Sequence, residues 1–141
     1  MSHDCLFCGI VAGDVPGRIV HETDDTVAFL DVNPLAEGHT LVVPRAHRKR
    51  IGDLAPAEAG ALFRAVADVV PAVETALDAP ATTVAVNNGP AAGQEIDHVH
   101  VHIVPRYHSD GAGPIHRLFS DRPTVGEERM DDLAAAISAE F

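Results

Sequence analysis

The stretch HVHVHIVP, residues 98–105, places three histidines on alternate positions, with a valine in each gap. Strict alternation is the period of a β-strand, because successive side chains leave opposite faces of a sheet. His98, His100 and His102 therefore share one predicted face, and the β-branched residues between them share the other. Since the β-branched face needs a core, we expect the histidine face to open into a cleft. At about 3.3 Å of rise per residue the outer Cα atoms lie roughly 13 Å apart, so one metal ion could bind two histidines but hardly three.

The composition predicts one globular domain. The chain has 141 residues, of which 46% are hydrophobic, and this length is sufficient for a sizeable core. Its formal net charge of −11 argues against binding to nucleic acid or to anionic lipid, so a phosphorylated ligand must be held by local donors. No stretch resembles a signal peptide or a membrane span, and the two cysteines do not suggest a secreted disulfide framework. We expect a cytoplasmic protein with no nucleic-acid or membrane partner.

The hydrophobic pattern predicts five short strands. Residues 18–22 and 26–32 form a predicted hairpin across a polar turn. Residues 39–44, 82–88 and 98–105 supply the other three strands. A Gly/Pro-rich loop precedes the histidine strand, and its backbone could approach a ligand closely.

Two helices are predicted. The longer begins near Pro56, with Asp53 or a neighbour as its cap, and Pro71 should kink it or end it early. Its core stripe has helical spacing: Leu62, Val66, Val69, Val73 and Leu77. A short C-terminal helix has acidic first turns and carries Met130, Leu133, Ile137 and Phe141. Short antiparallel connections with one long inserted helix indicate an α+β domain.

The histidine run resembles the His-φ-His-φ-His-φ-φ signature of the histidine triad (HIT) superfamily. Three other blocks resemble the family in order and spacing: CLFCGIVAGDVP, VAFLDVNPLAEGHTLVVPRAH and NNGPAAGQ. The resemblance is closest to the bacterial Hint-like branch. It implies a five-stranded antiparallel half-barrel sheet in a single HIT domain over residues 1–141, with a core of about 5–106 and an extension of 107–141. It also implies a homodimer.

The activity that the resemblance implies is hydrolysis of purine nucleoside 5′-monophosphate conjugates, namely phosphoramidates, acyl conjugates and dinucleoside polyphosphates. His100 would attack the α-phosphorus and form a nucleotidyl intermediate that water then hydrolyses, without a catalytic cofactor. The other nitrogen of His100 should donate to a backbone carbonyl near His98. His102 could donate a hydrogen bond to the phosphate or a proton to the leaving group. His39 matches a fourth histidine beside the triad, although a polar residue opening an edge strand is a rival interpretation.

The resemblance also implies a nucleotide pocket. Asp31 matches an acidic residue that accepts hydrogen bonds from ribose hydroxyls, although it could instead cap the turn that follows. The matched base-binding positions, each of which could equally be ordinary core, are Leu6, Phe7, Phe29, Val32 and Leu41. The matched phosphate contacts, in a loop whose glycines could simply be turn residues, are Asn87, Gly93 and Gln94. Many Hint-like proteins have serine or threonine where this chain has Glu95, and a carboxylate there repels a phosphate unless it is turned away or protonated.

Cys5 and Cys8 allow three interpretations. A thioredoxin-like redox pair needs a preceding strand, for which the N-terminus is too short. Two reduced cysteines in a turn are a second possibility, and half of a tetrahedral zinc site is the third. Some similar bacterial proteins complete such a site at the positions of His47 and His98, which implies a structural Zn²⁺. Two other classes of function stay open at this point: a zinc-braced nucleotide-binding module with weak hydrolysis, and a metallohydrolase that uses two of the triad histidines.

Overall fold

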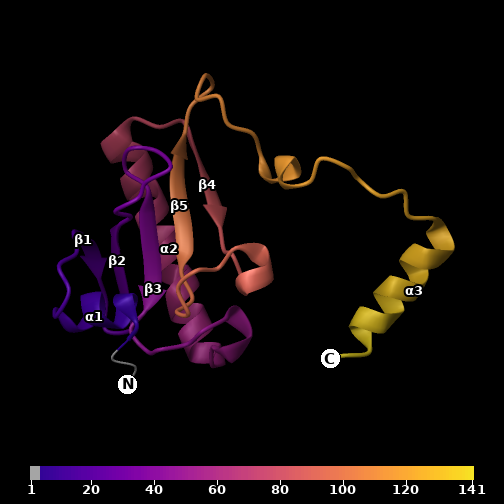
Figure 1. Cartoon of the computed structure of the whole chain (residues 1–141), viewed down its shortest axis with the longest axis horizontal. Coiled ribbons are helices and arrows are strands. Elements are labelled where there is room, and N and C mark those ends of the chain that lie inside the picture. Colours follow the sequence, from indigo (N-terminus) through magenta and orange to yellow (C-terminus); the bar gives the residue numbers. More distant parts are fainter. Residues whose placement is uncertain (1–3) are drawn as a thin grey trace. The chain divides into compact units, whose positions relative to one another are not determined.

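One antiparallel sheet of five strands organises the chain, which the computed structural model describes over residues 4–141. From edge to edge the strands follow the order β1-β2-β3-β5-β4 (Figure 1). This arrangement confirms the predicted α+β class and the hairpin of β1 and β2. The strands are β1 (Ile19–Glu22), β2 (Thr26–Leu30), β3 (Thr40–Pro44), β4 (Ala81–Ala85) and β5 (Val101–Arg106). The helices are α1 (Leu6–Ala12), α2 (Pro56–Leu77) and α3 (Glu127–Ser138).

The two faces of the sheet are covered by different helices. Figure 1 shows α2 lying along one face and the short α1 beside the first strands. The apolar cluster that includes α2 consists of Ala28, Val42, Leu62, Ala65, Val66, Val69, Val73, Val101 and Ile103. The cluster that includes α1 consists of Phe7, Ile10, Val27, Phe29, Leu41 and Val43. The central strands β2 and β3 are thus buried on both faces, which explains their nearly continuous apolar sequences.

Helix α2 differs from its prediction at two points. Its N-cap is Ala55, whose N–H donates to the Glu58 carboxylate at 2.8 Å, whereas Asp53 accepts the Arg50 N–H at 3.1 Å. Of the predicted alternatives, Asp53 or a neighbour, Asp53 itself is therefore wrong, and the cap lies two residues later. The helix also continues past Pro71 for six residues, so the predicted early end is wrong. Pro71 is on the exposed side, and packing of the buried side against the sheet keeps the helix continuous across the missing hydrogen bond.

The histidine strand is shorter than predicted. Strand β5 begins at Val101, because the N–H of Val99 donates outside the sheet, to the carbonyl of Arg48 at 2.7 Å. The alternation nevertheless persists, since the β-branched residues at 99, 101 and 103 are at most 1% exposed. The expectation that the histidine face opens into a cleft holds for His100 and His102, which line a cavity, and is wrong for His98, which is 0% exposed. Phe7 of α1 packs against the rings of His98 and His100.

The described residues form two units, one ending at Asp110 and the other spanning Gly111–Phe141. The second unit contains the predicted C-terminal helix, α3, with Glu127 and Glu128 in its first turn. No residue of α3 is buried. Within residues 4–141, no helix combines the length and the apolar character needed to cross a membrane.

Candidate active site and metal site

The His100 ring is held so that one nitrogen is available for chemistry. Its Nδ1 lies 2.7 Å from the backbone oxygen of His98. A carbonyl only accepts, so Nδ1 carries the proton and Nε2 of the neutral ring keeps its lone pair. Nε2 has no hydrogen-bond partner among the described residues, and His100 lines a cavity. The ring therefore presents a nucleophilic nitrogen to that cavity.

His102 and His39 form a directed pair of imidazoles. The backbone N–H of Leu35 donates to His39 Nδ1 at 3.0 Å, so neutral His39 carries its proton on Nε2. That Nε2–H donates to His102 Nδ1 at 2.9 Å. The proton of neutral His102 must then be on its own Nε2, which is buried without a partner within residues 4–141. His102 thus presents an unused N–H donor.

Both rings of this pair favour the neutral form. Burial, together with the imidazoles of His100 and His39, lowers the pKa of His102 to about 4. Burial also lowers the pKa of His39 from its ordinary value, against an opposing effect of Asp31, whose Oδ2 lies 3.7 Å from His39 Nε2. At neutral pH the pair is therefore uncharged, and the direction of its hydrogen bonds is fixed.

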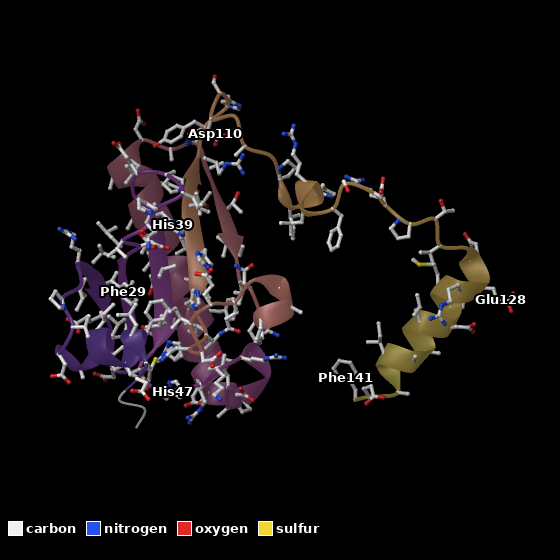
Figure 2. All side chains as sticks on the ribbon, viewed as in Figure 1. Phe29, His39, His47, Asp110, Glu128 and Phe141 are labelled. Atoms are coloured by element: carbon white, nitrogen blue, oxygen red, sulfur yellow. The ribbon has the colours of Figure 1, made fainter. Side chains whose placement is uncertain are left out.

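The cavity of about 510 Å³ that His100 and His102 line has many apolar residues in its wall. All five predicted base-binding residues contribute to its wall: Leu6, Phe7, Phe29, Val32 and Leu41. Phe7 and Phe29 meet edge to face with ring centroids 5.3 Å apart. Figure 2 places Phe29 between His39 and His47 in the view of the sheet. The shape and lining fit a flat apolar group beside a nucleophile.

Asp31 also lines this cavity, and at the same time it caps the turn that follows it, the role considered as an alternative to ribose binding. Its Oδ1 accepts the backbone N–H of Asn33 at 2.8 Å, which is the turn-capping bond considered from sequence. The second oxygen is left for His39 or for a ligand hydroxyl. The capping bond and a diol-binding role are therefore compatible in one carboxylate.

The three predicted phosphate contacts lie in the loop before the histidines, and two of them line the cavity. Asn87 and Gly93 line the cavity, with Gly93 at φ 100°, a conformation that favours glycine. Gln94 is not in the cavity wall. Its amide donates to the carbonyls of Lys49 and Ile96 at 2.7 and 2.9 Å and accepts the N–H of Gly89 at 2.8 Å. Gln94 thus braces the loop, a role that its sequence position alone did not indicate.

The four predicted zinc ligands converge. The ligand atoms of Cys5, Cys8, His47 and His98 all lie within 4.8 Å of one another, and both cysteines are free. Cys8 Sγ lies 3.2 Å from His47 Nδ1 and 3.5 Å from His98 Nδ1, while Cys5 Sγ lies 3.4 Å from His98 Nδ1. Zn–S bonds of about 2.3 Å and Zn–N bonds of 2.0–2.1 Å in a tetrahedron give S to N separations of about 3.6 Å. These residues therefore fit a tetrahedral metal ion with little rearrangement.

The outer hydrogen bonds of this cluster also suit a metal. His98 Nε2–H donates to the Pro44 carbonyl at 2.8 Å, which leaves Nδ1 as the ligand atom, as is usual for metal-binding histidines. Burial, and then the hydrogen bond and charge of Cys5, raise the pKa of the Cys8 thiol to about 11. A cation is what would allow these thiols to bind as thiolates at neutral pH.

A second group of potential metal ligands has hydrogen bonds that do not suit a metal. Asp31, His39 and His102 also lie within 4.8 Å of one another. A metal there would need the lone pair of His39 Nε2, but the Leu35 N–H already holds the other nitrogen as acceptor and places the proton on Nε2. The hydrogen bonds therefore favour a neutral proton-donor chain, and they argue against the metallohydrolase.

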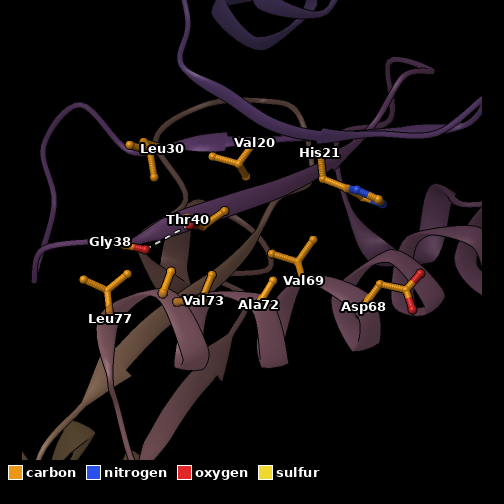
Figure 3. A pocket seen from close by; sticks show the side chains of 11 residues that line it. Val20, His21, Leu30, Gly38, Thr40, Asp68, Val69, Ala72, Val73 and Leu77 are labelled. Atoms are coloured by element: carbon orange, nitrogen blue, oxygen red, sulfur yellow. Dashed lines mark hydrogen bonds between the residues drawn. The ribbon is translucent and has the colours of Figure 1, made fainter.

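Another cavity, of about 310 Å³, lies between α2 and the sheet (Figure 3). Its lining is mostly aliphatic, with Val20, Leu30, Val69 and Leu77 prominent in the close-up. None of the predicted site residues contributes to it. The catalytic and metal-ligating side chains instead gather on the α1 face of the sheet.

A family model and several known proteins match most of the chain. A model of the HIT domain matches residues 12–109. The chain is 36% identical to Protein hit of Bacillus subtilis over 138 residues, which cover 97% of this chain and 94% of that protein. It is also 36% identical to Adenylylsulfatase HINT3 of Arabidopsis thaliana over 110 residues, covering 78% of this chain and 56% of that protein.

A solved structure bears on the metal site. The crystal structure of a Zn-bound histidine triad family protein from Mycobacterium smegmatis superposes with a TM-score of 0.73 at 32% sequence identity. The match covers 96% of this chain and 94% of that one.

Proposed function

The chain belongs to the HIT domain family, and we propose that it hydrolyses purine nucleoside 5′-monophosphate conjugates through a covalent intermediate on His100. The observation that carries this proposal is the hydrogen bond from His100 Nδ1 to the His98 carbonyl, which leaves Nε2 as an unprotonated nucleophile facing the cavity. The conjugates would be phosphoramidates, acyl conjugates or dinucleoside polyphosphates.

The reaction has two displacements at phosphorus. In the first, His100 Nε2 forms a bond to the α-phosphorus, the bond to the leaving group breaks, and the leaving group takes its electron pair and a proton. In the second, water attacks the same phosphorus and gives up a proton, which replaces the one taken by the leaving group. The P–N bond breaks with its electron pair returning to His100 Nε2, and the nucleoside monophosphate is released. A neutral imidazole suits both steps, because it is a nucleophile in the first and a leaving group in the second.

His102 supplies a donor for these steps. Within residues 4–141 its Nε2–H has no partner, and it would donate to a phosphoryl oxygen or to the leaving atom of a bound substrate. The His39 ring, anchored by the Leu35 N–H, fixes the tautomer in which that donor exists. His39 is therefore a positioning residue.

Binding of the nucleoside would use the apolar residues of the cavity wall. A purine would lie against Phe7, Phe29 and Leu41, and the free oxygen of Asp31 would accept hydrogen bonds from the ribose. Gly93 and Asn87 would approach the phosphate. Gln94 would act through the loop conformation, since its side-chain amide is already bonded to the backbone.

A structural Zn²⁺ is part of the proposal. Cys5, Cys8, His47 and His98 would hold it, and all four ligand positions would come from the protein, so the ion would do no chemistry on the substrate. It would join the N-terminal segment and α1 to the histidine run. We also propose a cytoplasmic homodimer, as the family resemblance implies.

The experiment that tests the activity measures AMP release from adenosine 5′-phosphoramidate and from diadenosine tetraphosphate. Wild type should release AMP, and His100→Ala should lose about a thousandfold or more in turnover, because the nucleophile is gone. His108→Ala is the matched control, since His108 is exposed and outside the cavity. Full turnover by His100→Ala would contradict the proposal, and AMP binding without turnover by wild type would favour a nucleotide-binding module.

A further inference from the structure

The proposed mechanism leaves one residue of the cavity wall without a role. Glu95 is exposed and lines the cavity into which His100 Nε2 opens. No hydrogen bond or ion pair joins its carboxylate to another residue within the described chain. A carboxylate at this place repels an anionic ligand and attracts a cation.

Glu95 also lines a second, smaller cleft. This side cleft, of about 330 Å³, shares Leu6, Glu95 and Ile96 with the main cavity. The side cleft also contains two further carboxylates, Asp4 and Asp97, and the ammonium group of Lys49. Cys5 and His47, two of the proposed zinc ligands, complete its lining. Among residues 4–141 none of Asp4, Asp97 and Lys49 has an ion pair, so the side cleft presents an excess of negative charge to a ligand.

The position of the side cleft relates it to the leaving group. Asp31 and Glu95 are the charged residues among those that line the cavity, and with Asp31 bound to the ribose and the α-phosphorus at His100, Glu95 is the charged group left to the leaving group. His100 is 8% exposed, and its free nitrogen faces this cavity, so a ligand must bring its reacting atom there. Atoms beyond the scissile bond would then pass Glu95 and enter the side cleft.

We propose that Glu95 makes the reaction selective for conjugates whose leaving group carries a positive charge, such as the phosphoramidate of a diamine. The inference rests on the proposed hydrolysis and names its substrate class. Displacement at phosphorus is unchanged: the P–N bond breaks, the leaving nitrogen takes a proton, and the distant ammonium group lies beside Glu95. The same carboxylate disfavours leaving groups that carry phosphate or carboxylate.

The test uses three adenosine 5′-phosphoramidates with the same P–N bond and the same tail length. Their leaving groups are 1,5-diaminopentane, pentylamine and 5-aminopentanoate, which carry a cationic, a neutral and an anionic tail. For the wild type we expect kcat/KM to fall by about fivefold from the cationic to the neutral conjugate, and again from the neutral to the anionic conjugate, as for partly exposed charge pairs. Added salt should reduce this range, since exposed charges are screened.

Glu95→Gln is expected to reduce the ratio of kcat/KM for the cationic conjugate to kcat/KM for the anionic conjugate by about fivefold. Asp4 and Asp97 should maintain the rest of the preference. Glu95→Lys should reverse the order. Asp24→Asn, which removes an exposed carboxylate outside both clefts, should leave the ratio unchanged. Equal kcat/KM for the three conjugates, or an unchanged ratio in Glu95→Gln, overturns the inference and leaves the hydrolase in place. No turnover of any conjugate overturns the hydrolase, and the inference with it.

Discussion

The three histidines of the run differ because the hydrogen bonds of each ring differ. His98 donates from Nε2 and offers Nδ1 to a metal, whereas His100 donates from Nδ1 and offers Nε2 to the cavity. His102 accepts at Nδ1 and is left with an N–H donor. In the proposed function one residue type would thus supply a ligand, a nucleophile and a donor. Backbone carbonyls assign the first two roles, and the His39 ring assigns the third.

At this scale we predict that His39 acts through His102. His39→Ala should lower kcat by about tenfold or more, because it removes the hydrogen bond that fixes the His102 tautomer. His39→Gln, whose amide can donate to Nδ1, should keep part of the activity. Nitrogen NMR of the His102 ring is the second readout, with an unprotonated Nδ1 in wild type and a tautomer mixture in His39→Ala. A single unchanged tautomer in His39→Ala would contradict the prediction.

The low pKa of His102 predicts how stability depends on pH. The unfolded ring takes its proton near its ordinary value of 6.5, whereas the folded ring takes it near 4. Between these values the unfolded state binds more protons, so the free energy of unfolding rises with pH and is lost as pH falls from 6.5 towards 4. Urea unfolding measures this loss. Between pH 6.5 and 4 the free energy of unfolding of the wild type should fall by about 1–2 kcal/mol more than that of His102→Gln, after allowance for solvent screening. The same pH dependence of the free energy of unfolding in wild type and His102→Gln would refute a low pKa for His102. His108→Gln, the control, should behave as the wild type does.

At the scale of elements, the proposed zinc connects parts of the chain that lie far apart in the sequence. Its ligands come from the start of α1, the segment after β3 and the residues before β5. The same His98 that would bind the ion holds His100 through its backbone oxygen. Loss of the ion should therefore loosen the nucleophile as well as the fold.

We predict one Zn²⁺ per chain in protein purified without chelator. Cys8→Ser should lose the metal and lower the free energy of unfolding by about 3 kcal/mol or more, as expected for an ion bound well above its dissociation constant. Metal analysis and thermal unfolding measure the two effects. Loss of stability and activity together on chelation fits a structural ion. Chelation that removed activity and left stability intact would indicate a catalytic metal.

The elements were predictable to the extent that they depend on local patterns. Alternation and turn residues placed all five strands, and the stripe from Leu62 to Leu77 placed α2. The ends were less predictable, because tertiary packing carries α2 past Pro71, and a bond from Val99 to Arg48 delays the start of β5. The contact of His39 with His102 depends on the register of β3 against β5, and nothing in the sequence specifies that register.

At the scale of the whole molecule, the core belongs to the first unit. Every buried hydrophobic residue of the described chain lies between Phe7 and Ile103. The second unit, Gly111–Phe141, contributes none of them, although it carries exposed apolar residues such as Phe119 and Ile137. The single domain over the full length, predicted from the resemblance, therefore remains a prediction.

A chain that ends at Asp110 tests this point. Asp110 is kept because it accepts hydrogen bonds from Arg106 and from the Tyr107 N–H. We expect the shortened protein to unfold cooperatively and to lose less than about 2 kcal/mol, because its two apolar clusters are complete. Calorimetry and urea titration measure this. Failure of the shortened chain to fold would show that the extension belongs to the same cooperative domain.

The central claim is that His100 carries the nucleotidyl group during turnover. The most direct measurement is the intact mass of the protein, quenched within milliseconds of mixing with adenosine 5′-phosphoramidate, followed by mapping of the modified peptide. We expect a mass gain of one adenylyl group on the peptide that contains His100, and no gain in His100→Ala. Steady AMP release with no adenylyl group on that peptide at any quench time would contradict it.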